Sequence, residues 1–177
     1  GDALLNFGTE IALNKDNLTP LDAKALKVLY TFSGAKGMIL GQVLDLFSET
    51  STKIDEKLLF DIYINKTSKL LIAPLLVAST LANNKYYNEL YEFGLNFGIM
   101  FQITDDILDV TGTLEEIGKT PHKDVEENKL TAIKIYGLEK SKVLAKKYFD
   151  KCIETINKVP NSELLSEFAY KIYMRKN

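Results

Sequence analysis

Cysteine and arginine are almost missing from this chain of 177 residues. Its one cysteine, Cys152, has no second cysteine with which to form an internal disulfide, which fits a reducing cytoplasm, where we expect the protein to act. The one arginine, Arg175, stands close to the C-terminus, so no guanidinium fork for a diphosphate precedes it. Phosphate recognition elsewhere along the chain would therefore have to come from lysine.

Two further absences concern charge and long hydrophobic runs. The net charge is −2 at pH 7, so no excess of positive charge predicts nucleic-acid binding. No run reaches the roughly eighteen apolar residues that predict a membrane-spanning helix. A hydrophobic fraction of 46% is enough to bury a core, and we expect a single domain over residues 1–177.

Proline is scarce, with four in the chain, and no alternation of apolar and polar residues of useful length predicts a strand. The sequence therefore predicts an all-α fold. We expect a kink near Lys69, because Pro74 lacks the backbone N–H that a regular helix needs. The expected helices cover residues 2–14, 20–33, 38–47, 55–83, 86–108, 129–136, 138–158 and 162–173.

The stretch with the most chemistry is QITDDILD, at the end of the helix expected over residues 86–108. At about 100° per residue, Gly98, Gln102, Asp105 and Asp109 fall within about 60° of one another on that helix. Two carboxylates one turn apart repel each other, so a cation should compensate them. Oxygen ligands suit magnesium better than zinc. The stretch thus predicts a magnesium site with Asp105 and Asp109 as ligands.

The alternative is an acidic helix end in contact with water. Ile103, Ile107 and Leu108 make the stretch too apolar for a free surface. Gly94 and Gly98 lie on the preceding turns and leave a strip without side chains, where an elongated apolar ligand could lie. We therefore favour the metal site over the solvated helix end.

Two other stretches carry polar groups that packing alone would not require. Gly41 and Asp45 lie one turn apart, and a glycine inside a helix costs about 1 kcal/mol relative to alanine. Close approach of a helix or a ligand would offset that cost, and tight helix packing is an equally good explanation. Lys66 and Thr67 lie between apolar runs, so the lysine would be partly buried unless it binds an anion. Such pairs are also common on exposed helix faces.

A charged loop follows the central helix. Lys119, Lys123 and Lys129 would bring positive charge over the aspartates if this loop folds back on the helix. A solvated loop is the alternative. His122, the only histidine, follows a proline in this loop, and we interpret it as a surface residue.

Taken together, these stretches resemble the trans-prenyl diphosphate synthase family, which includes farnesyl and geranylgeranyl diphosphate synthases. The similarity extends over essentially the whole chain, and the motifs occur in the family's order. The matching segments are the second aspartate-rich motif at residues 105–109, a Gly-Gln-x-Leu-Asp segment at 41–45, the pair Lys66-Thr67, the flap residues Lys119, Lys123 and Lys129, and the opening residues 1–5, which are similar to the helix after the first aspartate-rich motif.

The resemblance implies an isoprenoid synthase-type helical bundle around a central cavity, usually as a homodimer. It implies an enzyme, a prenyltransferase that condenses an allylic diphosphate with isopentenyl diphosphate, with Mg²⁺ as the cofactor that assists ionisation. The same resemblance assigns the roles of individual residues. Asp105 would bind magnesium directly, with Asp109 nearby, and whether Asp106 also binds the metal is left open. Lys66 and Lys119 would neutralise the allylic diphosphate, and Lys129 matches a flap lysine. Thr67 and Gln102 would flank the developing carbocation.

One part of the family pattern has no counterpart in the chain. The first aspartate-rich motif would precede Gly1, and Asp105-Asp106 is the only Asp-Asp pair. We therefore expect about the C-terminal two-thirds of a synthase, incomplete at the N-terminus and inactive alone. The alternative is a non-catalytic subunit that acts as a dimerisation or interaction partner. The residues that commonly set product length would also lie upstream, and a farnesyl-length product is the default expectation.

Overall fold

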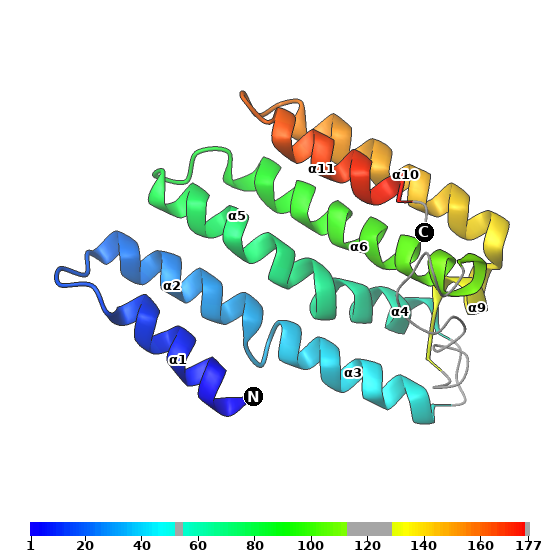
Figure 1. The fold of residues 1–177 in the computed structure, drawn as a ribbon, viewed down its shortest axis with the longest axis horizontal. Helices are drawn as coiled ribbons and strands as arrows, with labels where there is room; N and C mark the ends of the chain where they lie inside the picture. Colours follow the sequence, from blue (N-terminus) through cyan, green and yellow to red (C-terminus); the bar gives the residue numbers. More distant parts are fainter. Residues whose placement is uncertain (52–54, 113–128, 176–177) are drawn as a thin grey trace.

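The computed structural model describes residues 1–51, 55–112 and 129–175, and in these ranges every regular element is a helix (Figure 1). The predicted all-α fold is confirmed. The elements are α1 (Asp2–Leu13), α2 (Pro20–Ser33), α3 (Met38–Thr50), α4 (Glu56–Ile62), the π-helical turn η1 (Tyr63–Ser68), α5 (Lys69–Leu81), α6 (Tyr87–Thr111), α9 (Ala132–Tyr136), α10 (Leu138–Ile156) and α11 (Glu163–Tyr173).

Most predicted helix positions agree with the structure to within a few residues. The second helix begins and ends where it was expected. Thr19 fixes its start, because its hydroxyl oxygen accepts a hydrogen bond from the Asp22 N–H at 3.1 Å. The third helix runs to Thr50, three residues beyond its predicted end at Phe47. The segment at Lys129 is not helical, since α9 begins only at Ala132.

The expected kink takes a different form from the one predicted. Pro74 lies inside α5, and the irregular element is the π turn η1, which ends at Ser68, directly before α5 begins at Lys69. A π turn closes its hydrogen bonds over five residues instead of four, so it changes the direction of the side chains that follow it. The segments α4, η1 and α5 follow one another without a break.

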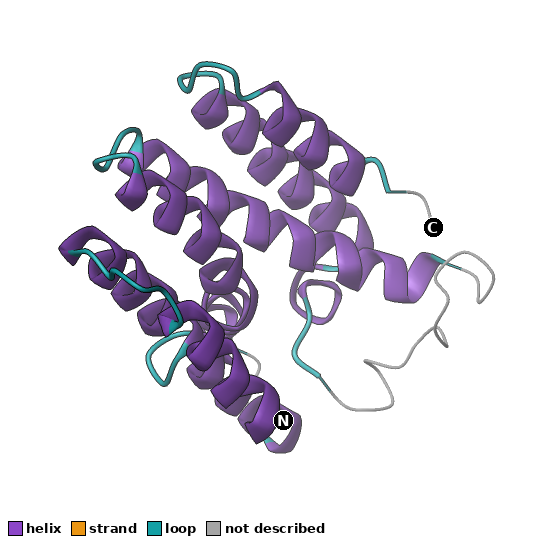
Figure 2. Cartoon of the chain, turned by 60° about the vertical axis from the view of Figure 1, so that its left-hand side comes forward, coloured by secondary structure: helices purple, strands orange, loops and turns teal. Residues whose placement is uncertain are grey.

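The longest helix, α6, lies at the centre of the described bundle. In Figures 1 and 2, α5 lies between α2 and α6, while α10 and α11 cover the other side of α6. Phe93, Phe97 and Met100 of α6 are buried in one core cluster with Cys152 and Ile156 of α10. A second cluster joins α4, η1, α6 and α10 nearer the C-terminal end of α6, through Leu59, Ile62, Tyr63, Ile99, Ile103, Leu130, Ala132 and Ala145.

The glycines of α3 and α6 are places where other helices come close. A side chain at Gly41 would overlap the backbone of Lys66 in η1, and one at Gly98 would overlap Ser68. At Gly94, an added Cβ would lie 2.8 Å from the Ile72 side chain of α5. The strip expected to hold an apolar ligand is therefore filled by η1 and α5, and that prediction was wrong. Tight helix packing explains these glycines.

No helix in the described parts of the chain is both long enough and apolar enough to cross a lipid bilayer.

Replacing Gly41 by alanine tests this close packing. Because the new methyl group would overlap the Lys66 backbone, we expect Gly41→Ala to lower the free energy of unfolding by about 1–3 kcal/mol. The matched control is Gly8→Ala on α1, where an added Cβ meets nothing within 4 Å. That variant should keep or raise stability, by up to about 1 kcal/mol, through helix propensity. Urea unfolding followed by circular dichroism measures both; equal effects would contradict the packing.

The single cysteine provides a second test of the core. Cys152 is fully buried, and burial raises the pKa of its thiol to about 12. Since the thiolate is the reactive form, the folded chain should react with a thiol reagent at pH 8 only as fast as it unfolds. Labelling rates measured in increasing urea should follow the unfolding transition. Rapid labelling in the absence of urea would show that α6 does not cover this position of α10.

Candidate functional site

A polar cavity of about 200 Å³ lies beside the C-terminal half of α6. Four separate segments meet there: α3, the end of α4 with η1, α6, and the residues that lead into α9. Tertiary structure thus brings together groups that are far apart in the sequence. Its lining residues are Asp45, Ile62, Tyr63, Lys66, Gln102, Asp105, Asp106, Lys129, Leu130 and Thr131.

Lys66 enters the cavity from η1 and forms an ion pair with Asp45 of α3. The side chains are 27% and 12% exposed, so this pair is partly shielded from water. The contact of Gly41 with the η1 backbone, one turn before Asp45, brings the two helices close enough for the pair to form. Sequence reasoning noted Asp45 only beside Gly41 and missed this partnership. The spacing of Gly41 and Asp45 on one helix face was the available signal.

Thr67 and Gln102 were predicted to act together, and the structure brings them into contact. The Thr67 hydroxyl donates a hydrogen bond to the Gln102 side-chain oxygen across the η1–α6 interface. Gln102 lines the polar cavity, and Thr67 is not among the lining residues. The Thr67 hydroxyl therefore orients the Gln102 amide, which lines the cavity.

Asp106, whose role the sequence left open, is held in a buried hydrogen-bond network. Its Oδ2 accepts from the Tyr63 hydroxyl and, at 2.6 Å, from the backbone N–H of Ala132. The same N–H lies 2.9 Å from the Tyr63 hydroxyl oxygen. Ala132 is the first residue of α9, where backbone N–H groups lack partners within the helix. Asp106 thus attaches the segment containing Lys129 to α6.

The two aspartates predicted as metal ligands are presented differently. Asp105 lines the polar cavity, while Asp109, one turn further along α6, is 1% exposed and is not part of the lining. Lys129 reaches the cavity, as does Lys66. Lys119 lies outside the described residues.

The donors in this cavity suit a hard cation that arrives with phosphate. In the described residues, no three histidine, cysteine or acidic side chains are arranged to hold a metal ion by themselves. Mg²⁺ commonly binds one or two carboxylates and completes its six oxygen ligands with water and substrate phosphates. Asp105 and Asp45, which line the same cavity as Gln102, fit that pattern.

The fold and the site together define the class of protein. It is an all-helical protein in which carboxylates, lysines and an amide line one polar cavity. The chain belongs to the polyprenyl synthetase family, because the family's model, Polyprenyl synthetase, matches residues 1–171. Similar relatives carry the names of specific synthases. The chain is 39% identical to farnesyl diphosphate synthase from Micrococcus luteus over 157 residues, covering 88% of this chain and 53% of the relative. It is 34% identical to farnesyl diphosphate synthase from Haemophilus influenzae, covering 100% and 61%.

Solved structures show the same fold. A geranyltransferase from Helicobacter pylori, complexed with magnesium and isoprenyl diphosphate, superposes with a TM-score of 0.81 at 32% identity, over 97% of this chain and 57% of that one. A geranylgeranyl pyrophosphate synthetase from Pyrococcus horikoshii superposes with a TM-score of 0.86 at 23% identity, over 99% of this chain and 65% of that one, and shows the fold alone. The chain spans about half the length of the curated relatives it matches.

Removing the Tyr63 hydroxyl tests the network around Asp106. Tyr63→Phe deletes a donor to a buried carboxylate, so we expect the free energy of unfolding to fall by about 1.5–3 kcal/mol. The control is Tyr170→Phe on the exposed side of α11, which should change stability by less than about 0.5 kcal/mol. Hydrogen exchange of the Ala132 amide should also become faster in Tyr63→Phe. Unchanged exchange would show that the phenol does not hold α9.

Proposed function

We propose that this chain forms the metal-side part of a polyprenyl diphosphate synthase, which joins an allylic diphosphate to isopentenyl diphosphate. The observation that carries the proposal is the convergence of Asp105, Lys66, Lys129 and Gln102 on one cavity from three separate segments. Those residue types are the ones needed to bind a magnesium-bound diphosphate and to face a developing carbocation. Membership of the family, with relatives named as farnesyl and geranylgeranyl synthases, supports this reaction class.

Diphosphate leaves only when its negative charge is neutralised. Mg²⁺, when bound, would supply Lewis-acid stabilisation of the leaving oxygens. Among the chain's own residues, Asp105 would be the ligand facing the cavity, and the buried Asp109 would support it from one turn behind. The Lys66 ammonium would exchange part of its contact with Asp45 for a phosphate oxygen. Lys129, and Lys119 outside the described residues, would add further positive charge.

The carbon that loses the diphosphate becomes a cation, which must be stabilised without water. The amide dipole of Gln102 would face that carbon, and the Thr67 hydroxyl would hold the amide in place through their hydrogen bond. The C–O bond would break with its electron pair leaving on diphosphate, and the double bond of isopentenyl diphosphate would form the new C–C bond. The cation left on the isopentenyl unit would lose a proton from the adjacent carbon to the released diphosphate, which restores a double bond. A farnesyl-length product, a homodimer and a cytoplasmic location remain parts of this proposal.

The decisive experiment compares Asp105→Asn with Asp16→Asn. Asp105→Asn keeps the shape of the side chain but removes the charge that would bind the metal, so prenyl transfer should fall by roughly two orders of magnitude or more, while the helical circular dichroism is retained. Asp16 is exposed in the α1–α2 connection, and its variant should remain active. The assay is incorporation of labelled isopentenyl diphosphate with geranyl diphosphate and Mg²⁺.

The assay is run both on residues 1–177 and on the full translated product of the gene, because the chain spans about half the length of its relatives. Activity of the full product that is lost in Asp105→Asn supports the proposal. An active full product that is indifferent to Asp105→Asn removes the metal-ligand assignment. A full product that never turns over, yet associates with an active synthase, would instead favour a non-catalytic subunit.

A further inference from the structure

Tyr63, the first residue of η1, lies where the core meets the polar cavity. Its side chain is 3% exposed, and its ring belongs to the core cluster that also contains Leu130 and Ala132. Packing alone would require the ring but not the hydroxyl, since a buried phenol must find a hydrogen-bond partner. The contacts of the hydroxyl therefore indicate what this tyrosine does.

The hydroxyl takes part in a triangle of three hydrogen bonds. It donates its proton to Asp106 Oδ2. The backbone N–H of Ala132 is shared between that carboxylate oxygen, at 2.6 Å, and the Tyr63 hydroxyl oxygen, at 2.9 Å. Both bonds to Asp106 are strengthened by the charge of the carboxylate. The start of η1, the C-terminal part of α6 and the start of α9 are thus joined at one point.

The bond at Ala132 lies three residues from Lys129, which lines the polar cavity. Three residues span at most about 10 Å, so Ala132 limits how far the Lys129 backbone can move. Between them, Leu130 is 6% exposed and packs in the same core cluster as Tyr63, and Thr131 caps α9. The position of the Lys129 ammonium therefore depends on the bonds made at Ala132.

The phenol also determines how Asp106 uses its charge. Asp106 is itself among the residues that line the cavity. A carboxylate has about four lone-pair sites, and Tyr63 and Ala132 together donate two hydrogen bonds to Oδ2. Without the phenol, less of this negative charge would be compensated, and Asp106 would compete with a diphosphate for the Lys129 ammonium.

We propose that Tyr63 is a positioning residue for the diphosphate, which holds Lys129 at the cavity through Asp106 and Ala132. The inference rests on the proposed function for the identity of the ligand. Tyr63 acts through other residues, so removal of its hydroxyl should weaken diphosphate binding and leave the chemical step nearly unchanged.

Titration of the full translated product with inorganic diphosphate and Mg²⁺ tests this role. Tyr63→Phe keeps the ring and removes the hydroxyl, so diphosphate should bind about tenfold more weakly. The KM for geranyl diphosphate should rise by a similar factor, while kcat changes by less than about threefold. A lower kcat with an unchanged KM would overturn the proposal.

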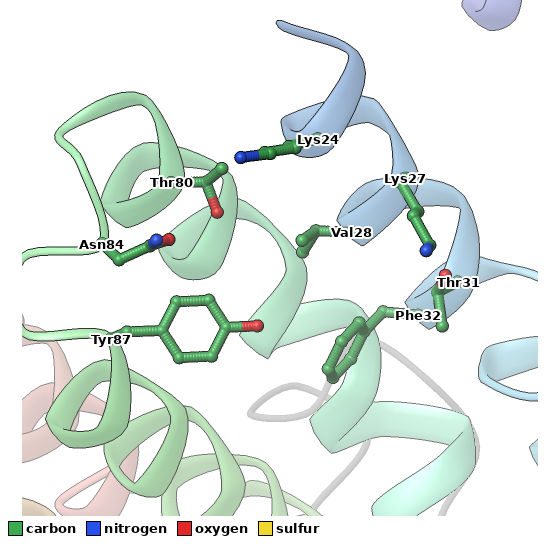
Figure 3. A pocket seen from close by; sticks show the side chains of 8 residues that line it. All are labelled: Lys24, Lys27, Val28, Thr31, Phe32, Thr80, Asn84 and Tyr87. Carbon is green, nitrogen blue, oxygen red and sulfur yellow. The ribbon is translucent and has the colours of Figure 1, made fainter. Parts of the chain in front are cut away.

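Tyr87→Phe is the matched control, because it removes the same hydroxyl at the other end of α6. Tyr87 lines a separate pocket, and its hydroxyl is directed toward the space between Val28 and Phe32 (Figure 3). Tyr87 and Asp106 are 19 residues apart on α6, or about 28 Å along its axis. This variant should bind diphosphate as the unmodified chain does. Equal weakening in both variants would refute a local effect of Tyr63.

Double variants separate the positioning of Lys129 from a general loosening of η1. Lys66 lies three residues after Tyr63 in the same π turn, so a loosened turn would disturb both lysines. If Tyr63 acts through Lys129, Tyr63→Phe combined with Lys129→Gln should bind diphosphate as weakly as Lys129→Gln alone. Combined with Lys66→Gln, the two losses should multiply. Losses that multiply in both pairs would contradict the proposal.

A measurement without ligand distinguishes failure of this proposal from failure of the proposed function. Reductive methylation with ¹³C-formaldehyde labels the lysine side chains for NMR, and Lys129→Arg identifies the Lys129 signal by its loss. This signal should shift in Tyr63→Phe, once circular dichroism has confirmed its fold, and should stay in place in Tyr87→Phe. An unshifted signal in Tyr63→Phe would refute the role of Tyr63. If the signal shifts but the unmodified product binds no diphosphate with Mg²⁺, the proposed function fails and the anchoring of Lys129 by Tyr63 stands.

Discussion

The arrangement of the polar cavity depends on the close contact of the π turn η1 with two glycines. Gly41 of α3 and Gly98 of α6 press against η1 where any Cβ would overlap its atoms. A π turn redirects the side chains that follow it, and the glycine contacts fix that direction. Lys66 consequently reaches Asp45 on one side, while the adjacent Thr67 hydroxyl reaches α6 on the other. The helix-propensity cost of the glycines is offset by this approach.

Asp105 and Asp106 of α6 make different contacts, because consecutive helical residues point about 100° apart. Asp105 faces the polar cavity together with Lys66, whereas Asp106 also bonds Tyr63 and the start of α9. The Asp105 carboxylate can therefore face a ligand, while the Asp106 carboxylate holds the start of α9 against α6. The anchored segment carries Lys129, so a structural hydrogen bond determines where that positive charge lies.

Periodicity predicted the all-α fold and most helix positions, because helices that bury one face repeat apolar residues every 3.6 positions. Periodicity carries no information about which helices meet. The convergence of Lys66, Gln102 and Asp105 was therefore expected from the resemblance to a family. The π turn has the same apolar spacing as an α-helix and was not foreseen. The strip at Gly94 and Gly98 was misassigned, because a glycine strip admits a neighbouring helix as readily as a ligand.

The charged side chains that line the polar cavity limit which ligands it can bind. Among its described residues, Asp45, Asp105 and Asp106 outnumber Lys66 and Lys129. A bare diphosphate would meet this acidic surplus at close range, where repulsion is only partly screened. The described residues alone therefore favour an anion that brings positive charge with it. In the proposed reaction, a divalent cation on the phosphate oxygens would supply that charge, and the surplus of carboxylates would attract the complex.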